Sequence, residues 1–332
     1  MAKKRKQKPK QKKATTPLDQ PLLMGRVIRS VGSSHRVQTE AGQTVDCVVR
    51  GKFRIQEVNS TNPVAVGDLV GFLPPGEEEE MGVITEIQPR KNYLLRKAIA
   101  HARKVHILAA NVDQAILLFT ITLPATSTGF ANRFLTVAEA YHIPVQVVIN
   151  KVDLVTSEEQ RARLAEVKQI YTGIGYPVHE VNALDEGYRE AVQALLRDKI
   201  SFVGGHSGAG KSTLINLIDS SLDLKTGDVS AYHQKGKHTT VYAEMFPLQG
   251  GGYIIDSPGI KELGLVNFEK EELSHFFPEM RERLPECRFS NCLHRNEPGC
   301  AIKAALQTGG VHPSRYDSYL RMLEEVEEGQ GY

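Results

Sequence analysis

A glycine-rich segment at residues 205–212 constrains the fold of this chain more than any other feature. It reads Gly-His-Ser-Gly-Ala-Gly-Lys-Ser, follows the apolar run Ile200–Val203 and precedes a helical pattern over Thr213–Ile218. Strand, loop and helix in this order are the context in which G-x-x-x-x-G-K-[ST] cradles nucleotide phosphates. A glycine-rich turn without a ligand is the alternative. The three features together favour a nucleotide-binding α/β domain with helices on both faces of its sheet.

The residue types of this loop suit phosphate binding. Glycines let backbone N–H groups approach a phosphate, and the dipole of the following helix favours negative charge. We expect Lys211 to contact the β- and γ-phosphates and to act in catalysis, and the Ser212 hydroxyl to ligate Mg²⁺. The predicted phosphate site is Gly205, His206, Ser207, Gly208, Ala209, Gly210, Lys211, Ser212 and Thr213.

A second apolar run leads to a predicted magnesium and γ-phosphate switch. Tyr253–Ile255 is followed by Asp256, Ser257, Pro258 and Gly259. A carboxylate at the end of such a strand would lie near Mg²⁺, usually through water, and the Gly259 N–H would donate to a γ-phosphate. Taken alone, this tetrapeptide could be any turn. Its place downstream of the phosphate loop predicts the switch.

The run Val147–Ile149 ends in Asn150, Lys151, Val152 and Asp153, which predicts a guanine site. The Asp153 carboxylate can accept from guanine N1–H and from its exocyclic amine together, and adenine presents no such pair. Binding a base without these donors would leave the carboxylate buried and unpaired, which costs several kcal/mol, so such a base is rejected. The Lys151 stem would cover the base and Asn150 would tie this loop to the phosphate loop; a polar turn is the alternative.

A further predicted strand ends at Asn182 and Ala183, and we expect a backbone N–H there to support guanine O6. The order of these motifs is unusual, because the base motif precedes the phosphate loop. Circular permutation of a GTP-binding domain explains this order most simply. The switch then runs directly into the C-terminal segment, so nucleotide state can move that segment.

The C-terminal segment carries a predicted metal site. Cys287, Cys292, His294 and Cys300 offer three thiols and one imidazole, which suits one structural Zn²⁺ per chain. Unliganded cysteines or a disulfide are the alternative. Cys47 lies in a β-rich run and is predicted to be a small core residue.

Residues 24–88 predict a small all-β domain. Glycine and proline separate five short β-rich runs, which suits an OB-type barrel, although a fold alone does not define a function. The runs are Arg26–Val31, His35–Thr39, Val45–Arg50, Asp68–Leu73 and Val83–Ile87.

Residues 1–20 form a basic arm with little that could pack. Lysines and arginines crowd its first part without any acid, whereas the rest of the chain holds more acidic than basic residues. We expect a disordered arm that neutralises nucleic-acid phosphates; a solubilising tail is the alternative. No apolar segment follows the charges and no apolar run approaches the ~20 residues of a membrane span, so we expect no signal peptide, no membrane span and a cytoplasmic protein.

Four segments are therefore predicted. They are a disordered basic arm over 1–20, an OB-fold RNA-binding domain over 21–92, a circularly permuted α/β P-loop GTPase domain over 93–262 and a helical zinc-binding domain over 263–332.

Several motifs together resemble the RsgA family of small ribosomal subunit biogenesis GTPases, over about residues 24–325. They are the permuted order, Gly51–Arg54, Val66–Asp68, His238-Thr239-Thr240, D-S-P-G, C-R-F-S-N-C-L-H-R-N-E-P-G-C-A and S-R-Y-D-S-Y-L. The resemblance implies an OB-fold, a permuted GTPase and a zinc domain. It also implies late maturation of the small (30S) ribosomal subunit on its rRNA, with slow GTP hydrolysis that the subunit stimulates. His206 and Lys237 stand where the family usually carries Gln and Arg.

The catalytic residue is less constrained by the sequence. Ile260 follows Gly259 where many GTPases carry a glutamine that orients water, and an apolar side chain cannot do this. His238 is the best replacement by reach and chemistry, although it could instead contact RNA or pack. Thr239 or Thr240 would contact Mg²⁺, and the sequence does not choose between them.

The sequence thus predicts a monomeric GTPase that binds GTP and GDP, contains zinc and docks on small-subunit rRNA. A nucleotide-gated RNA-binding module with incidental hydrolysis is a second hypothesis. An ATPase or kinase is a third, and the base motif argues against it.

Overall fold

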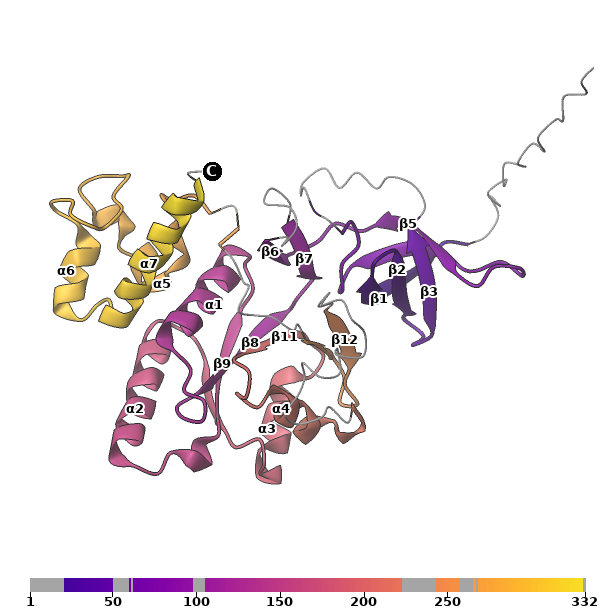
Figure 1. Cartoon of the computed structure of the whole chain (residues 1–332), viewed down its shortest axis with the longest axis horizontal. Helices are drawn as coiled ribbons and strands as arrows, with labels where there is room; N and C mark the ends of the chain where they lie inside the picture. The colour runs from indigo at the N-terminus through magenta and orange to yellow at the C-terminus, as the bar shows by residue number, and fades with distance from the viewer. Residues whose placement is uncertain are drawn as a thin grey trace, which may run out of the picture.

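The computed structural model of the protein describes residues 21–49, 60, 62–97, 105–222, 243–256, 265, 266 and 268–330. Figure 1 shows a barrel of strands, an α/β sheet beside it and a helical C-terminal region on the far side of that sheet. The predicted basic arm, the predicted motif Gly51–Arg54 and most of the predicted switch residues lie outside the described residues. The predicted boundaries at residues 20, 92 and 262 stay predictions.

Five N-terminal strands form a closed barrel, which confirms the prediction of an OB-type fold. The order β1-β2-β3-β5-β4 closes because β4 also pairs with β1. The strands are β1 Leu23–Val31, β2 Ser34–Thr39, β3 Thr44–Val49, β4 Leu69–Leu73 and β5 Gly82–Ile87. Apolar side chains fill the interior, and Cys47 is fully buried among them, as predicted for a core residue.

The barrel meets the hairpin of β6 (Tyr93–Lys97) and β7 (Val105–Ala110) at Gly67. Gly67 has φ +93°, and a Cβ built on it would lie 2.0 Å from the Ala110 carbonyl oxygen, so only glycine fits there. The neighbouring Asp68 carboxylate is fully buried and accepts a hydrogen bond of 2.6 Å from Arg90 Nε. These contacts fix the barrel against the chain that leads into the α/β sheet.

The α/β sheet has the order β10-β9-β8-β11-β13-β12, and it continues into the barrel through a pairing of β12 with β1. Five of its strands are parallel, and β12 runs antiparallel to β13. The strands are β8 Gln114–Thr120, β9 Val145–Asn150, β10 Val178–Val181, β11 Ile200–Gly205, β12 Glu244–Pro247 and β13 Tyr253–Asp256. The sequence predicted the parallel strands, but it did not predict β12 or the hairpin of β6 and β7.

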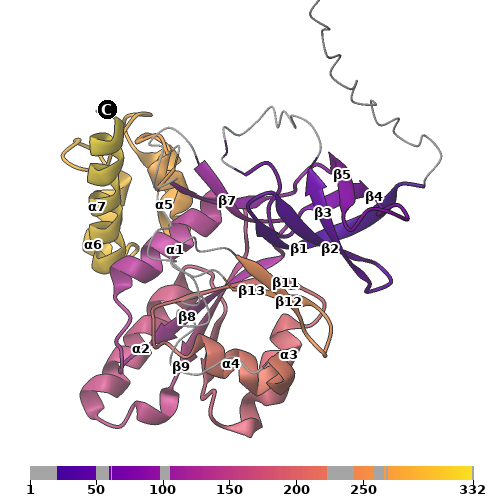
Figure 2. The ribbon, with the colours of Figure 1, turned by 45° about the vertical axis from the view of Figure 1, so that its right-hand side comes forward.

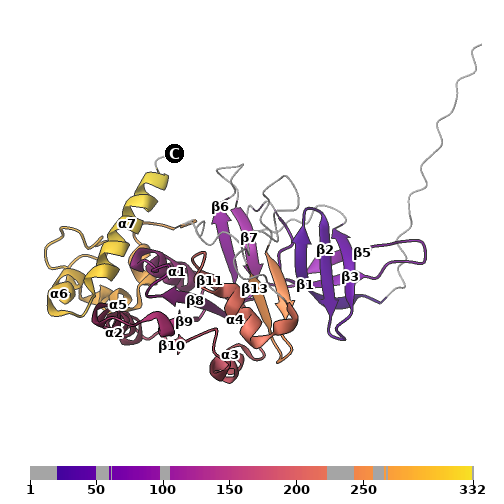
Figure 3. The same cartoon turned by 60° about the horizontal axis from the view of Figure 1, so that its bottom comes forward.

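Side-chain alternation along the strands explains why helices cover both faces. On β8, Leu117 and Phe119 face the cluster that includes α1 and α2, whereas Ile116 and Leu118 face the cluster that includes α3 and α4. A strand buried on both faces carries a continuous apolar run, as β8 does over residues 115–119. The helices are α1 Thr128–Ala140, α2 Glu158–Gly173, α3 Arg189–Leu196 and α4 Lys211–Ile218. Figure 3 shows the two helix layers on opposite sides of the strands.

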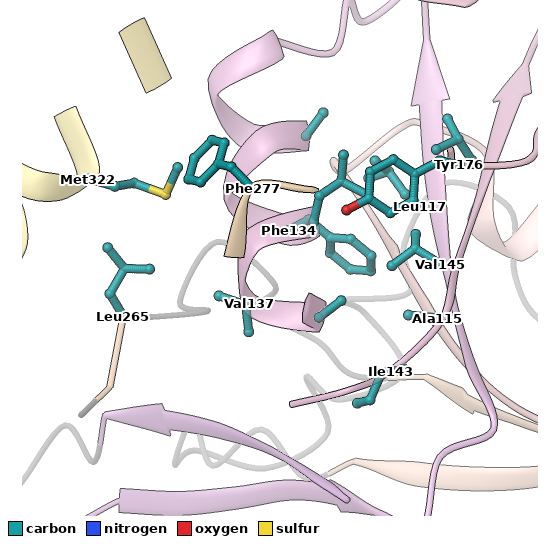
Figure 4. Close-up of a cluster of buried hydrophobic side chains, with 14 of the residues drawn as sticks. Ala115, Leu117, Phe134, Val137, Ile143, Val145, Tyr176, Leu265, Phe277 and Met322 are labelled. Atoms are coloured by element: carbon teal, nitrogen blue, oxygen red, sulfur yellow. The ribbon is translucent and has the colours of Figure 1, made fainter. Parts of the chain in front are cut away.

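The C-terminal region consists of α5 (Pro278–Arg281), α6 (Ala301–Thr308), α7 (Pro313–Gln330) and short 3₁₀ turns. The region packs on α1, as the views of Figure 1 and Figure 2 both show. In Figure 4, Phe134 of α1 faces the strands, while Phe277 and Met322 of the C-terminal region lie on the other side of that helix. Asn132 of α1 is fully buried and donates to Ser318 Oγ of α7 at 2.8 Å. The C-terminal region is therefore fixed on α1 as well as joined to the predicted switch by the chain.

Candidate functional site

The predicted phosphate loop connects β11 to α4 at the carboxyl edge of the sheet. Gly208 and Gly210 have φ of +80° and +94°, which glycine adopts without strain. A Cβ built on Gly210 would lie 2.3 Å from Asn150 Nδ2, so a side chain there would displace Asn150. The first N–H groups of α4 face the loop, where the helix dipole favours an anion.

Lys211 begins α4 and folds back over this loop. Its Nζ donates to the carbonyls of Gly205 at 2.8 Å and of His206 at 3.0 Å. Burial lowers the pKa of Lys211, and the nearby Asp256 carboxylate opposes this shift. The ammonium group is thus held at the loop by main-chain carbonyls and by the attraction of a carboxylate.

Asn150 joins the predicted base motif to the phosphate loop. Its Nδ2 donates to the Ala209 carbonyl at 2.9 Å, and its Oδ1 accepts from the Ala183 N–H at 3.1 Å. Both bonds are buried, and they form because β9 and β10 pair in parallel with Val181 opposite Asn150. The tie that the sequence predicted between the two loops is therefore present. The Ala183 amide already donates to Asn150, so its contact with guanine O6 stays a prediction.

The remaining base-motif residues lie at the same edge. Lys151 adopts a left-handed conformation, with φ 62°, and its Nζ donates to the Leu123 carbonyl at 2.6 Å. Asp153 follows in a 3₁₀ turn, Val152–Leu154, with its side chain exposed. Asn182 Oδ1 accepts from the Leu184 N–H at 3.0 Å, which shapes the turn after β10. The geometry leaves the Asp153 carboxylate accessible to a base.

Two of the predicted magnesium ligands lie at the carboxyl edge of neighbouring strands. Ser212 is buried in the first turn of α4, and Asp256 is buried at the end of β13. β13 pairs with β11 so that Asp256 lies opposite Val203, two residues before the phosphate loop begins. His238, Thr239, Thr240 and Gly259 lie outside the described residues.

The structure also brings the segment from the end of β8 to the first turn of α1 against the phosphate loop, a contact that the sequence did not indicate. A Cβ built on Gly208 would lie 3.3 Å from Pro124 Cδ, and the His206 ring contacts the Phe130 ring in a tilted arrangement, with centroids 4.0 Å apart. One signal could have indicated this segment. It follows the carboxyl end of a buried parallel strand, where ligand sites of α/β sheets form.

The four predicted metal ligands converge in the C-terminal region. Ligand atoms of Cys287, Cys292, His294 and Cys300 all lie within 4.8 Å of one another, and all four cysteines of the chain are free thiols rather than disulfides. His294 Nδ1 lies 3.7 Å from Cys287 Sγ and 3.4 Å from Cys300 Sγ. This donor set and spacing suit a tetrahedral structural zinc site, with His294 binding through Nδ1.

The electrostatics of this cluster also suit a cation. Burial raises the pKa of Cys292 to about 12 and lowers the pKa of His294, so the imidazole is neutral, the form that ligates a metal. A bound cation would supply the charge that a buried thiolate requires. Helix α7 holds the loop in place, because Tyr316 Oη and Tyr319 Oη donate to the carbonyls of His294 and Leu293 at 2.6 and 2.9 Å.

Two family models match the chain. One, described as RsgA N-terminal domain, matches residues 24–84, and one described as RsgA GTPase matches residues 87–266. The chain belongs to the RsgA GTPase family. It is 46% identical to a Small ribosomal subunit biogenesis GTPase RsgA from Bacteroides fragilis over 93% of this chain and 98% of that protein. It is 47% identical to a protein of the same name from Phocaeicola vulgatus, with the same coverage.

Two solved structures match the fold over most of the chain. YjeQ from Thermotoga maritima aligns with a TM-score of 0.74 and 34% identity, over 92% of this chain and 99% of that one. YloQ, described as a circularly permuted GTPase, aligns with a TM-score of 0.70 and 29% identity, over 95% and 98%. The family GTPase model includes the base motif ahead of the phosphate loop, so the predicted permutation is confirmed. In the described part of the chain, no helix has the length and apolar character needed to cross a membrane.

Proposed function

We propose that this protein is a GTP hydrolase that assists late maturation of the small (30S) ribosomal subunit. One observation carries the nucleotide assignment: Asn150 of the base motif donates to the Ala209 carbonyl of the phosphate loop at 2.9 Å. This bond joins a segment suited to guanine with a segment suited to phosphates. The ribosomal assignment is supported by relatives that are named for small-subunit biogenesis and match over nearly their full length.

In this proposal the guanine base lies at the edge formed by β9 and β10. Asp153 accepts from two guanine donors, the Lys151 stem covers the base, and Val152, Asn182 and Ala183 shape the pocket. The exposed Asp153 carboxylate and the bond that holds Lys151 Nζ on the Leu123 carbonyl support these roles. A base without the paired donors of guanine leaves the carboxylate unpaired and binds more weakly.

The phosphates and Mg²⁺ would occupy the adjoining loop, Gly205–Thr213. Ser212 would ligate Mg²⁺, with Asp256 beside it and Thr239 or Thr240 completing the site, and Gly259 would donate to the γ-phosphate. Lys211 would stabilise charge on the transferring phosphoryl group, and His238 would orient the attacking water. The burial of Ser212 and Asp256 at neighbouring strand ends supports the magnesium site.

We further propose that the barrel, the basic arm and the C-terminal region contact small-subunit rRNA while GTP hydrolysis times release. In this proposal the chain acts as a monomer in the cytoplasm, where the subunit matures, and holds one structural Zn²⁺ on Cys287, Cys292, His294 and Cys300. The family membership favours a hydrolase over an RNA-binding module in which hydrolysis is incidental.

Competition for a fluorescent GDP analogue tests the nucleotide assignment. We expect GTP and GDP to displace the analogue and a 100-fold excess of ATP to leave it bound, because a site built on hydrogen bonds discriminates by about 10⁴-fold or more against a ligand without the matching donors. Equal displacement by ATP and GTP would contradict the guanine assignment.

A further inference from the structure

The phosphate loop is held on one side by a segment that carries none of the nucleotide motifs. This segment runs from the end of β8 into the first turn of α1, and it approaches the loop at two points. Pro124 lies beside Gly208, and the ring of Phe130 contacts the imidazole of His206 with centroids 4.0 Å apart and planes inclined by 35°. These contacts are separate from the Asn150 bond, which reaches the loop at Ala209.

The main-chain carbonyl of His206 accepts two hydrogen bonds that shape the phosphate loop. That carbonyl accepts from the Ala209 N–H at 3.1 Å, which closes the first turn of the loop, and from Lys211 Nζ at 3.0 Å. A ring held on Phe130 restricts the backbone of the same residue. The ring contact therefore helps to fix both the shape of the turn and the position of Lys211.

Phe130 is itself fixed at the start of α1. Its N–H donates to Ser127 Oγ at 3.3 Å, the N-cap of the helix. Two residues further, the buried Asn132 donates to Ser318 Oγ of α7, and Arg133 pairs with Glu325 of the same helix. The ring of Phe130 thus lies at one end of a helix whose outer side is bonded to the C-terminal region.

We propose that Phe130 is a positioning residue of the phosphate loop. Its ring holds His206, and through His206 the first turn of the loop, in the geometry that binds nucleotide phosphates. The same contact makes α1 the connection between the phosphate loop and the C-terminal region. This inference rests on the proposed function, because it concerns the same nucleotide site.

A double-mutant cycle on the full chain tests this role through the affinity for a fluorescent GDP analogue. Phe130→Leu and His206→Ala should each weaken binding by about 2- to 12-fold, which corresponds to the free energy of an aromatic pair. The double variant should bind the GDP analogue with about the affinity of whichever single variant binds it more weakly, because both changes remove the same contact. Phe130→Tyr keeps the ring and should retain the affinity of the unsubstituted chain.

Tyr141→Leu is the matched control. Tyr141 caps the opposite end of α1, and its ring contacts Tyr93 with centroids 5.6 Å apart. The substitution Tyr141→Leu should lower the free energy of unfolding without changing the affinity for the GDP analogue. Multiplied effects in the double variant, weak binding by Phe130→Tyr, or an equal loss in Tyr141→Leu would each refute the positioning role. Failure of the unsubstituted chain to bind the GDP analogue would instead refute the proposed function.

Discussion

Arg315 provides a sharp test of how the C-terminal region is held on the α/β sheet. Its side chain is fully buried, and its Nε and Nη2 donate to the two carboxylate oxygens of Glu279 at 2.7 and 3.1 Å. Nη1 donates to Asn132 Oδ1 of α1 at 3.1 Å, and the guanidinium lies 4.5 Å from the centre of the Phe277 ring. Arg315→Met keeps an unbranched apolar side chain in place of the aliphatic part of arginine but leaves the buried Glu279 carboxylate without its cation.

The burial of the pair sets the expected magnitude. Removing one partner of a buried ion pair lowers the free energy of unfolding by about 3–5 kcal/mol, whereas replacing both partners with apolar residues is often neutral. Arg315→Met should therefore be strongly destabilising, and the double change with Glu279→Leu should restore most of the loss. Arg295→Met is the control. It breaks the pair of Arg295 with Glu327, whose side chains are 33% and 32% exposed, so it should cost only about 0–1 kcal/mol.

Urea unfolding followed by far-ultraviolet circular dichroism measures these differences. With a slope near the upper end of the usual range of about 1–3 kcal/mol per M, the midpoint for Arg315→Met should fall by roughly 1–2 M. The midpoint for Arg295→Met should stay close to that of the unsubstituted chain. The reasoning is refuted when the two single variants lose equal stability, or when Glu279→Leu fails to rescue Arg315→Met.

Three further predictions concern the sites themselves. Asn150→Ala leaves the Ala183 N–H and the Ala209 carbonyl unpaired, so GTP affinity measured by calorimetry should fall by at least about tenfold; unchanged affinity would show that the bridge does not shape the site. Asp153→Asn turns one acceptor into a donor, so competition binding should show weaker GTP and stronger xanthosine triphosphate, and an unaltered preference would exclude Asp153 from base recognition. Elemental analysis should find about one zinc per chain, and Cys292→Ser should lose that zinc and unfold the C-terminal region; a folded, zinc-free protein would contradict the metal assignment.

The parts of the site that local sequence determines were predictable. The phosphate loop, the base motif and the four metal ligands each occupy a short segment, and the chemistry of each requires fixed residue types at fixed spacing. The barrel strands were predictable for a related reason, since glycine and proline separate β-rich runs. The base motif predicts that Asn150 contacts the phosphate loop. It does not predict that the Ala183 N–H donates to Asn150 Oδ1, because this bond depends on the pairing of β9 with β10.

The parts that depend on distant segments were not predictable. Phe130 and Pro124 reach the phosphate loop because the carboxyl ends of β8 and β11 lie side by side, and no spacing in the sequence reveals this. On α7, Tyr319 and Leu323 stand four residues apart in the sequence, as on one face of a helix, whereas Arg315 would be taken for a solvent-exposed charge because arginine is rarely buried without a partner. Its partner, Glu279, lies on another element.

Turnover of GTP with and without purified small ribosomal subunits tests the central claim most directly. The full chain should hydrolyse GTP slowly alone and faster with subunits present. Lys211→Ala, which removes the ammonium group held at the Gly205 and His206 carbonyls, should abolish hydrolysis in both conditions while the protein stays folded. Turnover that subunits leave unchanged, or that persists in folded Lys211→Ala, would contradict the account.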